Sequence, residues 1–527
     1  GAGFWRGQSR VAPLQSASRV SRRERSARGR RHRSRRHAPS AYPFTLGVAS
    51  GDPLPDSVVL WTRLASDPLT PDGSGGMEPT PVVIAWEVAE DEAFARGVQS
   101  GTVIAQPEFG HRVHVDVAGL EPGREYFYRF HVGTETSPVG RTKTAPPAGA
   151  SLERFRFAFA TCQHFEHGYY PAYRHLAQDE LDVVVFLGDY IYEYADSGEE
   201  ARAAGEIVRR HTGPETMTLA DYRLRHALYK TDPDLQAAHA AFPWVATWDD
   251  HEVAHDYAGL HDETGSPEDV FALRRAAAYQ AYYEHLPLRP ASMPQGPFMR
   301  LCRRLTFGDL IEFSVLDTRQ YRSDHPCGGG EQVLCGAALD PNFTMLGPEQ
   351  EQWVFAGLDA SRARWNILAQ QVLMAQLDHR EPPSRYFWTD AWDGYMSARN
   401  RLLTHVASRD IQNLIVLTGD WHCAFVNDLK LDFADPDSPT VGTEFVVTSI
   451  SSNGDSTAYG SYYGPMIPWN PHIKFFADRR GYQRVVVTPD LLQTDLQMVE
   501  TVRDPNPGIG TLASFVVEDG VPGAQSA

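Results

Sequence analysis

Four short apolar segments of this sequence each end in side chains of the kinds that bind metal ions. FAFATC ends at Cys162, VVVFLGD ends at Asp189 with Tyr192 shortly after, WVATWDDHE ends at Asp249, Asp250 and His251, and LIVLTGDWH ends at Asp420 and His422. Such short apolar runs, bounded by turn residues, predict buried strands. Ligands bind at the carboxyl ends of strands in α/β sheets, so we expect these side chains to gather at one edge of a sheet.

The residue types in this set favour hard cations. A thiolate, a phenolate and carboxylates suit trivalent iron, whereas carboxylate oxygens suit calcium or magnesium. Asp189 is central in the set and is able to bridge two ions. Taken singly, Cys162 reads as a small core residue, Tyr192 as a packing aromatic and His422 as an ordinary core histidine. Their occurrence together at independent strand ends favours a metal site.

The pattern along the chain predicts two folded regions. Residues 41–146 contain alternating or apolar strands and a Leu-x-Pro-Gly corner of the fibronectin or immunoglobulin kind. From residue 155 onward, predicted strands alternate with predicted helices, which indicates an α/β domain or a layered α/β/β/α domain. We therefore expect a disordered Arg-rich leader over 1–40, an all-β sandwich over 41–146 and a catalytic domain over 151–515.

Charge is divided unevenly between the leader and the rest of the chain. Residues 1–40 hold twelve Arg and one Glu and so carry about +11. Because the net charge of the whole chain is −18, the remaining 487 residues carry about −29. An acidic body argues against nucleic-acid binding and fits a protein that attracts cations. The leader has no apolar core of an export signal, and no apolar run long enough to span a membrane is present, so we expect no transmembrane segment.

The chain has five cysteines, so at least one is unpaired. Cys327 and Cys335 flank the loop CGGGEQVLC and are able to close a short disulfide if the protein is exported. The sequence contains no CxxC pair, which argues against a structural zinc site.

Several long motifs resemble the PhoD-like alkaline phosphatases, within the calcineurin-like metallophosphoesterases, and the implied site layout is similar to that of purple acid phosphatases. The resemblance covers about residues 42–505 and rests on FTLGVASGDPLPDSVVLWTRL, FATCQHFEHGYYPAYRHLA, LGDYIYEY, TWDDHEV, LDTRQYRS, WNILAQQVLMA, DAWDGYMSARNRLL, LTGDWHCAFVNDLK and NPHIKFFADRRGY. It implies Fe(III) held by Cys162, Asp189, Tyr192 and His422. It also implies Ca²⁺ that shares Asp189 and takes Asp250 and Asp420.

The same resemblance implies hydrolysis of phosphate monoesters and phosphodiesters by metal-activated water. Asp250 and His251 are the expected catalytic pair, with His251 bonding the phosphoryl group or protonating the leaving oxygen. His255 stands where family members often have Asn, and we assign it no role. Phosphate-ester small molecules are the expected substrates, and a phospholipid or a wall polymer is the alternative.

Two further segments allow functional and structural interpretations. Trp392, Asp393 and Tyr395 would either shape the substrate entrance or pack at a helix start. The DTRQYR segment, with Asp317, Arg319 and Arg322, would either bring a guanidinium to phosphate or form a buried ion pair.

The remaining alternatives concern the class and location of the protein. A phospholipase D-type or wall-polymer phosphodiesterase is the main alternative function, and a non-catalytic calcium-binding module is a second class. Family members commonly carry twin-arginine signals, which implies a secreted, periplasmic or cell-wall location, and a monomer is the favoured state.

Overall fold

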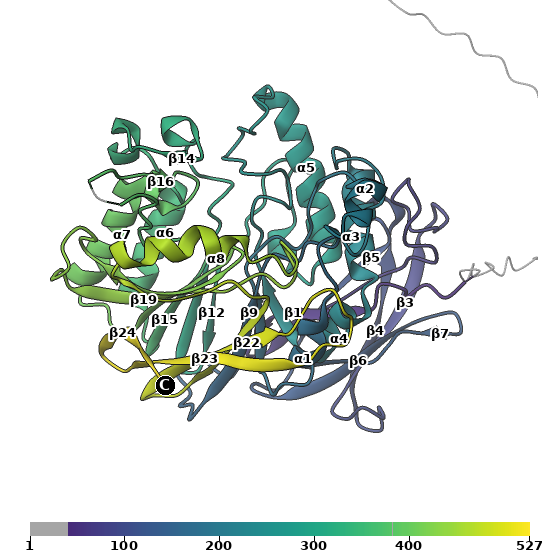
Figure 1. Cartoon of the computed structure of the whole chain (residues 1–527). Helices are drawn as coiled ribbons and strands as arrows, with labels where there is room; N and C mark the ends of the chain where they lie inside the picture. Colours follow the sequence, from purple (N-terminus) through teal and green to yellow (C-terminus); the bar gives the residue numbers. More distant parts are fainter. Residues whose placement is uncertain (1–40, 382) are drawn as a thin grey trace, which may run out of the picture. The chain divides into compact units, whose positions relative to one another are not determined.

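The computed structural model describes residues 41–381 and 383–527, so the predicted Arg-rich leader lies outside the described residues. Two large β-sheets dominate this part of the chain (Figure 1). The first has ten strands, in the order β24 (Val521–Ser526), β23 (Ile509–Glu518), β22 (Leu491–Val499), β21 (Gly481–Val487), β9 (Phe155–Ala160), β10 (Val183–Phe186), β11 (Pro243–Ala246), β1 (Val48–Leu54), β2 (Ser57–Arg63) and β5 (Arg112–Ala118). The second has seven strands, in the order β12 (Arg303–Phe307), β13 (Ile311–Val315), β15 (Trp365–Ala369), β17 (Leu414–Thr418), β19 (Thr440–Val446), β18 (Ala424–Lys430) and β20 (Ile473–Ala477).

The two sheets share one apolar core. Phe157 of β9 meets Phe313 of β13 edge to face, with ring centroids 5.2 Å apart, and Phe155 lies 4.5 Å from Phe307. Strands β9, β10 and β11 run parallel, and their residues are almost all buried. Parallel strands covered on both faces are expected to be continuously apolar, which explains the runs FAFA, VVVF and PWVA.

Helices cover the outer faces of both sheets. The core beside the ten-stranded sheet includes residues of α1 (Pro171–Leu176), α3 (Leu219–Lys230), α4 (Pro233–Ala241) and α5 (Glu268–His285). The core beside the seven-stranded sheet includes residues of α6 (Gly347–Ala360) and α7 (Met396–Ser408). The shorter elements are α2 (Gly198–Ala203), α8 (Ala458–Tyr463), and the pair β14 (Glu331–Gln332) and β16 (Phe387–Trp388). The predicted α/β/β/α layering is confirmed.

The N-terminal all-β region forms two sheets, one of which continues into the larger structure. β3 (Val82–Ala89), β4 (Gly97–Ala105), β6 (Glu125–Val132), β7 (Glu135–Thr136) and β8 (Gly140–Lys143) make a separate five-stranded sheet. By contrast, β1 pairs in parallel with β11, so β1, β2 and β5 extend the ten-stranded sheet. A common core of apolar residues joins the two sheets of this region.

The carboxyl ends of the central strands of both large sheets meet. Strands β13, β15, β17 and β19 are parallel to one another. Just beyond β9 and β19, Thr161 and Ser449 form a parallel β-bridge that links the two sheets. Side chains that follow strands of either sheet are therefore brought to a shared edge.

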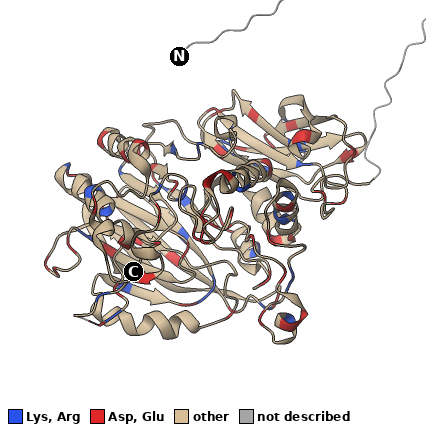
Figure 2. Ribbon diagram, turned by 90° about the horizontal axis from the view of Figure 1, so that it is seen from above, with Lys and Arg blue, Asp and Glu red and all other residues tan. Residues whose placement is uncertain are grey.

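Three further observations bear on expectations from the sequence. Cys327 and Cys335 form a disulfide, with Cα atoms 5.6 Å apart, while Cys162, Cys302 and Cys423 are free thiols. Among the described residues, no helix combines the length and the apolar character needed to cross a membrane. The acidic residues are spread over many elements rather than confined to one (Figure 2).

Candidate metal centre

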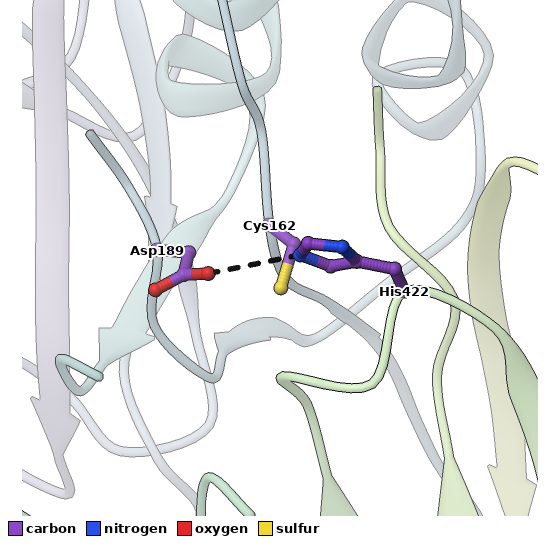
Figure 3. Close-up of side chains that lie close together, drawn as sticks. All are labelled: Cys162, Asp189 and His422. Atoms are coloured by element: carbon purple, nitrogen blue, oxygen red, sulfur yellow. Dashed lines mark ion pairs between the residues drawn. The ribbon is translucent and has the colours of Figure 1, made fainter. Parts of the chain in front are cut away.

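Cys162, Asp189, Tyr192 and His422, which we call the thiol cluster, lie together at the shared edge of the two sheets. Ligand atoms of Cys162, Asp189 and His422 are all within 4.8 Å of one another (Figure 3). The Tyr192 hydroxyl donates to Asp189 Oδ2 at 2.8 Å and is 3.1 Å from His422 Nε2. The structure thus brings together all four residues that the family resemblance implies for the first ion.

The backbone is strained where it presents these side chains. Cys162, Asp189, Asp420 and His422 have φ values of 55°, 59°, 61° and 57°. This left-handed region is uncommon for residues other than glycine and costs on the order of 1–3 kcal/mol each. Gly188 has φ 108°, and a Cβ there would lie 2.5 Å from the Asp249 backbone nitrogen. The turns after β9, β10 and β17 therefore hold their side chains in specific directions at an energetic cost.

The four side chains of the thiol cluster include no permanent cation. Burial, with the Asp189 carboxylate as the second cause, raises the pKa of Cys162 and of Tyr192 well above their usual values. Burial lowers the pKa of His422, which favours its neutral form. Asp189 Oδ1 is buried and has no hydrogen-bond partner among the described residues. A bound cation would satisfy this oxygen and favour the thiolate and phenolate forms, so the donor set fits a metal ion.

Next to the thiol cluster, a buried guanidinium lies among four carboxylates. This arginine cluster consists of Arg319 and Arg322 with Asp249, Asp250, Asp390 and Asp420. Arg319 lies at N–O distances of 2.5, 3.4, 2.7 and 3.7 Å from these four carboxylates respectively. Arg322 also pairs with Asp390, and His325 Nε2 lies 2.7 Å from the same carboxylate. Carboxylates outnumber guanidinium groups in this buried space.

The charges of the arginine cluster shift its carboxylates in opposite directions. Burial raises the pKa of Asp420 well above its usual value, and repulsion from Asp249 adds to the effect. For Asp390, burial acts in the same direction, but attraction to Arg319 and Arg322 outweighs it and leaves the pKa well below the usual range. The arginine side chains therefore neutralise part of this region and leave Asp420 under-compensated.

His251 is held beside Asp250 by a buried carboxylate. His251 Nδ1 is 2.7 Å from Glu193 Oε2, so its Nε2 faces Asp250 Oδ2 at 3.8 Å. Burial opposes a charge on His251, but Asp250 and Glu193 outweigh burial and raise its pKa well above the usual value. A protonated imidazole in this orientation is able to donate a proton from Nε2.

The predicted residues for the second ion are only partly brought together. Asp189, Asp249 and Asp250 form one group with ligand atoms within 4.8 Å of one another. Asp420 belongs to no such group of three among the described residues, and it faces Arg319 instead. Asp249 was visible in the sequence beside Asp250, whereas the position of Arg319 amid four carboxylates depends on contacts between distant segments.

The structure also shows the surroundings of the two segments for which the sequence allowed both a functional and a structural interpretation. Trp392, Asp393 and Tyr395 are all buried, so they pack rather than line an entrance. Trp392 Nε1 donates to Gln370 at 3.1 Å, Asp393 pairs with Arg399 at 2.6 Å, and the Tyr395 hydroxyl donates to the Ser323 carbonyl at 2.8 Å. The DTRQYR segment supplies the buried ion pairs of the arginine cluster.

Comparison with known proteins gives consistent results. The family model of the PhoD-like phosphatase matches residues 157–496, and that of the PhoD-like phosphatase N-terminal domain matches residues 29–146. Alkaline phosphatase D of Bacillus subtilis (strain 168) is 50% identical over 479 residues, which cover 91% of this chain and 81% of that protein.

Solved structures agree with these matches. The structure of PhoD superposes with a TM-score of 0.88 at 48% identity, and the match covers 93% of this chain and 92% of that chain. A purple acid phosphatase from yellow lupin superposes with a TM-score of 0.54 at 11% identity, covering 91% and 74% of the two chains, which shows a shared fold alone. The predicted fold class and family are confirmed, and the chain belongs to the PhoD-like phosphatase family of phosphoester hydrolases.

Proposed function

We propose that this enzyme hydrolyses phosphate monoesters and phosphodiesters with Fe(III) bound by the thiol cluster and Ca²⁺ bound beside it. The observation that carries the proposal is the convergence of Cys162, Asp189, Tyr192 and His422 on strained turns, with a buried Asp189 oxygen left without a partner. When bound, such cations would lower the pKa of water and neutralise phosphoryl oxygens.

Asp189 and Asp250 are the supported ligands of the second ion. Their carboxylates belong to one close group with Asp249, which supports a hard cation there. Asp420 completes the proposed set, but Arg319 Nη2 lies 3.7 Å from its Oδ1 and 3.4 Å from Asp250 Oδ1. Arg319 therefore competes for one oxygen of each of these carboxylates, and Asp249 is an alternative ligand.

The chain itself supplies a proton donor and a positive charge. Glu193 fixes the His251 ring, and the Asp250 and Glu193 carboxylates raise the pKa of His251, so Nε2 is suited to protonate a leaving oxygen. Arg319 is buried and its charge is secured by Asp249 and Asp390, so it acts on the site by holding the neighbouring carboxylates in place.

The domain division and location are also proposals. The family matches over 29–146 and 157–496 support a sandwich over 41–146 and a catalytic domain over 151–515. The Cys327–Cys335 disulfide supports an oxidising, secreted, periplasmic or cell-wall location, because such bonds rarely persist in a reducing cytosol. We expect a monomer that acts on phosphate-ester small molecules.

Rates of hydrolysis of matched substrates test the substrate range. p-Nitrophenyl phosphate represents monoesters, bis-(p-nitrophenyl) phosphate represents diesters, and phosphatidylcholine represents phospholipids. Turnover of the first two with none of the third supports the proposal. Turnover of phosphatidylcholine alone would favour the phospholipase D-type alternative, and calcium binding without any turnover would favour a non-catalytic module.

A further inference from the structure

Two histidines four residues apart face the same carboxylate beside the thiol cluster. The backbone N–H groups of Val253 and Ala254 both donate to the Asp250 carbonyl at 2.8 Å, so the segment makes a tight, helix-like turn. Residues four apart on such a turn lie on one face. The rings of His251 and His255 are accordingly stacked, with centroids 5.2 Å apart and planes at 17°.

One buried carboxylate orients both residues. Glu193 Oε2 lies 2.7 Å from His251 Nδ1, and Glu193 Oε1 accepts the backbone N–H of His255 at 2.7 Å. Histidines that bind metals commonly give their other ring nitrogen to a carboxylate in this way, which fixes the ring and directs the free nitrogen to the ion.

The distances between the three candidate ligand atoms fit a small metal ion, although Asp250 Oδ2 also accepts the Asp256 backbone N–H at 2.7 Å. His255 Nδ1 is 3.5 Å and His251 Nε2 is 3.8 Å from Asp250 Oδ2, and all three atoms lie within 4.8 Å of one another. Two ligands of a tetrahedral ion with bonds of about 2.0–2.1 Å are roughly 3.3 Å apart, so small side-chain shifts would close the site. His255 Nδ1 has no hydrogen-bond partner among the described residues, and 41% of the His255 side chain is exposed.

We propose that Asp250, His251 and His255 form a binding site for a borderline divalent transition metal such as Zn²⁺ or Co²⁺, and that its occupation inhibits the enzyme. Imidazole nitrogens favour such metals over calcium, which prefers oxygen ligands. An ion on His251 Nε2 removes the atom from which a leaving oxygen would be protonated. The inhibitory half of this inference rests on the proposed function, whereas the binding half does not.

Titration of the chelator-treated full chain with Co²⁺ alone tests the site by visible absorption. We expect cobalt bands that survive in Cys162→Ser, because the site is separate from the thiol cluster. Glu193→Gln should weaken cobalt binding about 10- to 100-fold, and His255→Ala at least as much. His261→Ala, which alters an exposed histidine outside the site, is the matched control and should bind as the wild type does.

Two outcomes would overturn the site. One is the loss of the cobalt bands in Cys162→Ser, and the other is wild-type affinity for cobalt in His255→Ala. The inhibitory half is measured separately, as hydrolysis of p-nitrophenyl phosphate by the iron- and calcium-loaded enzyme in increasing Zn²⁺. His255→Ala should need at least about tenfold more Zn²⁺ for half inhibition. Cobalt binding without zinc inhibition would overturn only the inhibitory half. A wild type that hydrolyses no phosphate ester would overturn the proposed function, while the cobalt titration would still decide the site.

Discussion

The thiol cluster and the arginine cluster are neighbouring groups of buried side chains, and they differ in which cations lie beside their negatively charged groups. In the arginine cluster, Arg319 and Arg322 are permanent cations paired with buried carboxylates. In the thiol cluster, the only basic side chain is His422, whose pKa burial lowers, and Asp189 keeps an unpartnered oxygen. The arginine cluster therefore contains permanent cations that compensate part of its negative charge. For the thiol cluster, the proposed cation is a bound ion.

The largest expected effect is on the thiol cluster. Asp189→Asn removes the carboxylate shared by both proposed ions and the acceptor of the Tyr192 hydroxyl. Loss of a direct ligand should exceed the 10- to 100-fold effect of an outer partner, so we expect hydrolysis to fall by about 100-fold or more, together with bound iron. Activity and metal content measured on the same preparation check this. Normal iron content together with normal turnover in Asp189→Asn would contradict this account of the thiol cluster.

The next largest effect should be on the stability of the arginine cluster. Arg319→Met leaves buried carboxylates without their cation, which typically costs about 3–5 kcal/mol. Urea unfolding of the metal-free protein measures the loss, and added Ca²⁺ should recover part of it. Arg210→Met is the matched control, because Arg210 pairs with Asp196 and Glu199 but is 32% exposed, so a much smaller loss is expected. Equal losses in the two variants would contradict the account.

Much of the thiol cluster could be predicted from the sequence, because its ligands come soon after apolar strands and ligands bind at the carboxyl ends of such strands. The arginine cluster could not, since Arg319 follows β13 of the seven-stranded sheet and meets Asp249, which follows β11 of the ten-stranded sheet, only after the two sheets have packed together. The same holds for β1, whose pairing with β11 joins segments almost two hundred residues apart. Glu193 follows Asp189 and Tyr192 in the chain, yet nothing local indicates that it orients His251.

A smaller effect should follow loss of the disulfide. The bond closes a short loop, because its two cysteines are eight positions apart. The loop begins shortly after His325, which contacts Asp390 of the arginine cluster. Chain-entropy arguments predict that Cys327→Ser with Cys335→Ser costs about 2.5 kcal/mol of unfolding free energy. Iron content should stay unchanged, because the thiol cluster lies on other segments. Loss of iron in this variant would mean that the two clusters are not independent.

The smallest expected effect is a difference in pH dependence. Asp420 has a folded pKa raised by burial and by Asp249, so in metal-free protein its contribution to stability falls as pH rises above about 3.9. The stability of wild type relative to Asp420→Asn should therefore decline by at most about 1.4 kcal/mol per pH unit. Asp390 has a lowered folded pKa, so the corresponding difference for Asp390→Asn should be constant above about pH 5. Urea unfolding across pH 4–8 measures both, and parallel curves would contradict the assignment.

The most direct test of the central claim is metal analysis of the purified enzyme together with its visible spectrum. A phenolate bound to ferric iron gives a coloured charge-transfer band, so the wild type should contain stoichiometric iron and be coloured. Tyr192→Phe should lose the band, because Tyr192 supplies the only phenol of the thiol cluster. A colourless, iron-free preparation with full phosphatase activity would contradict the account.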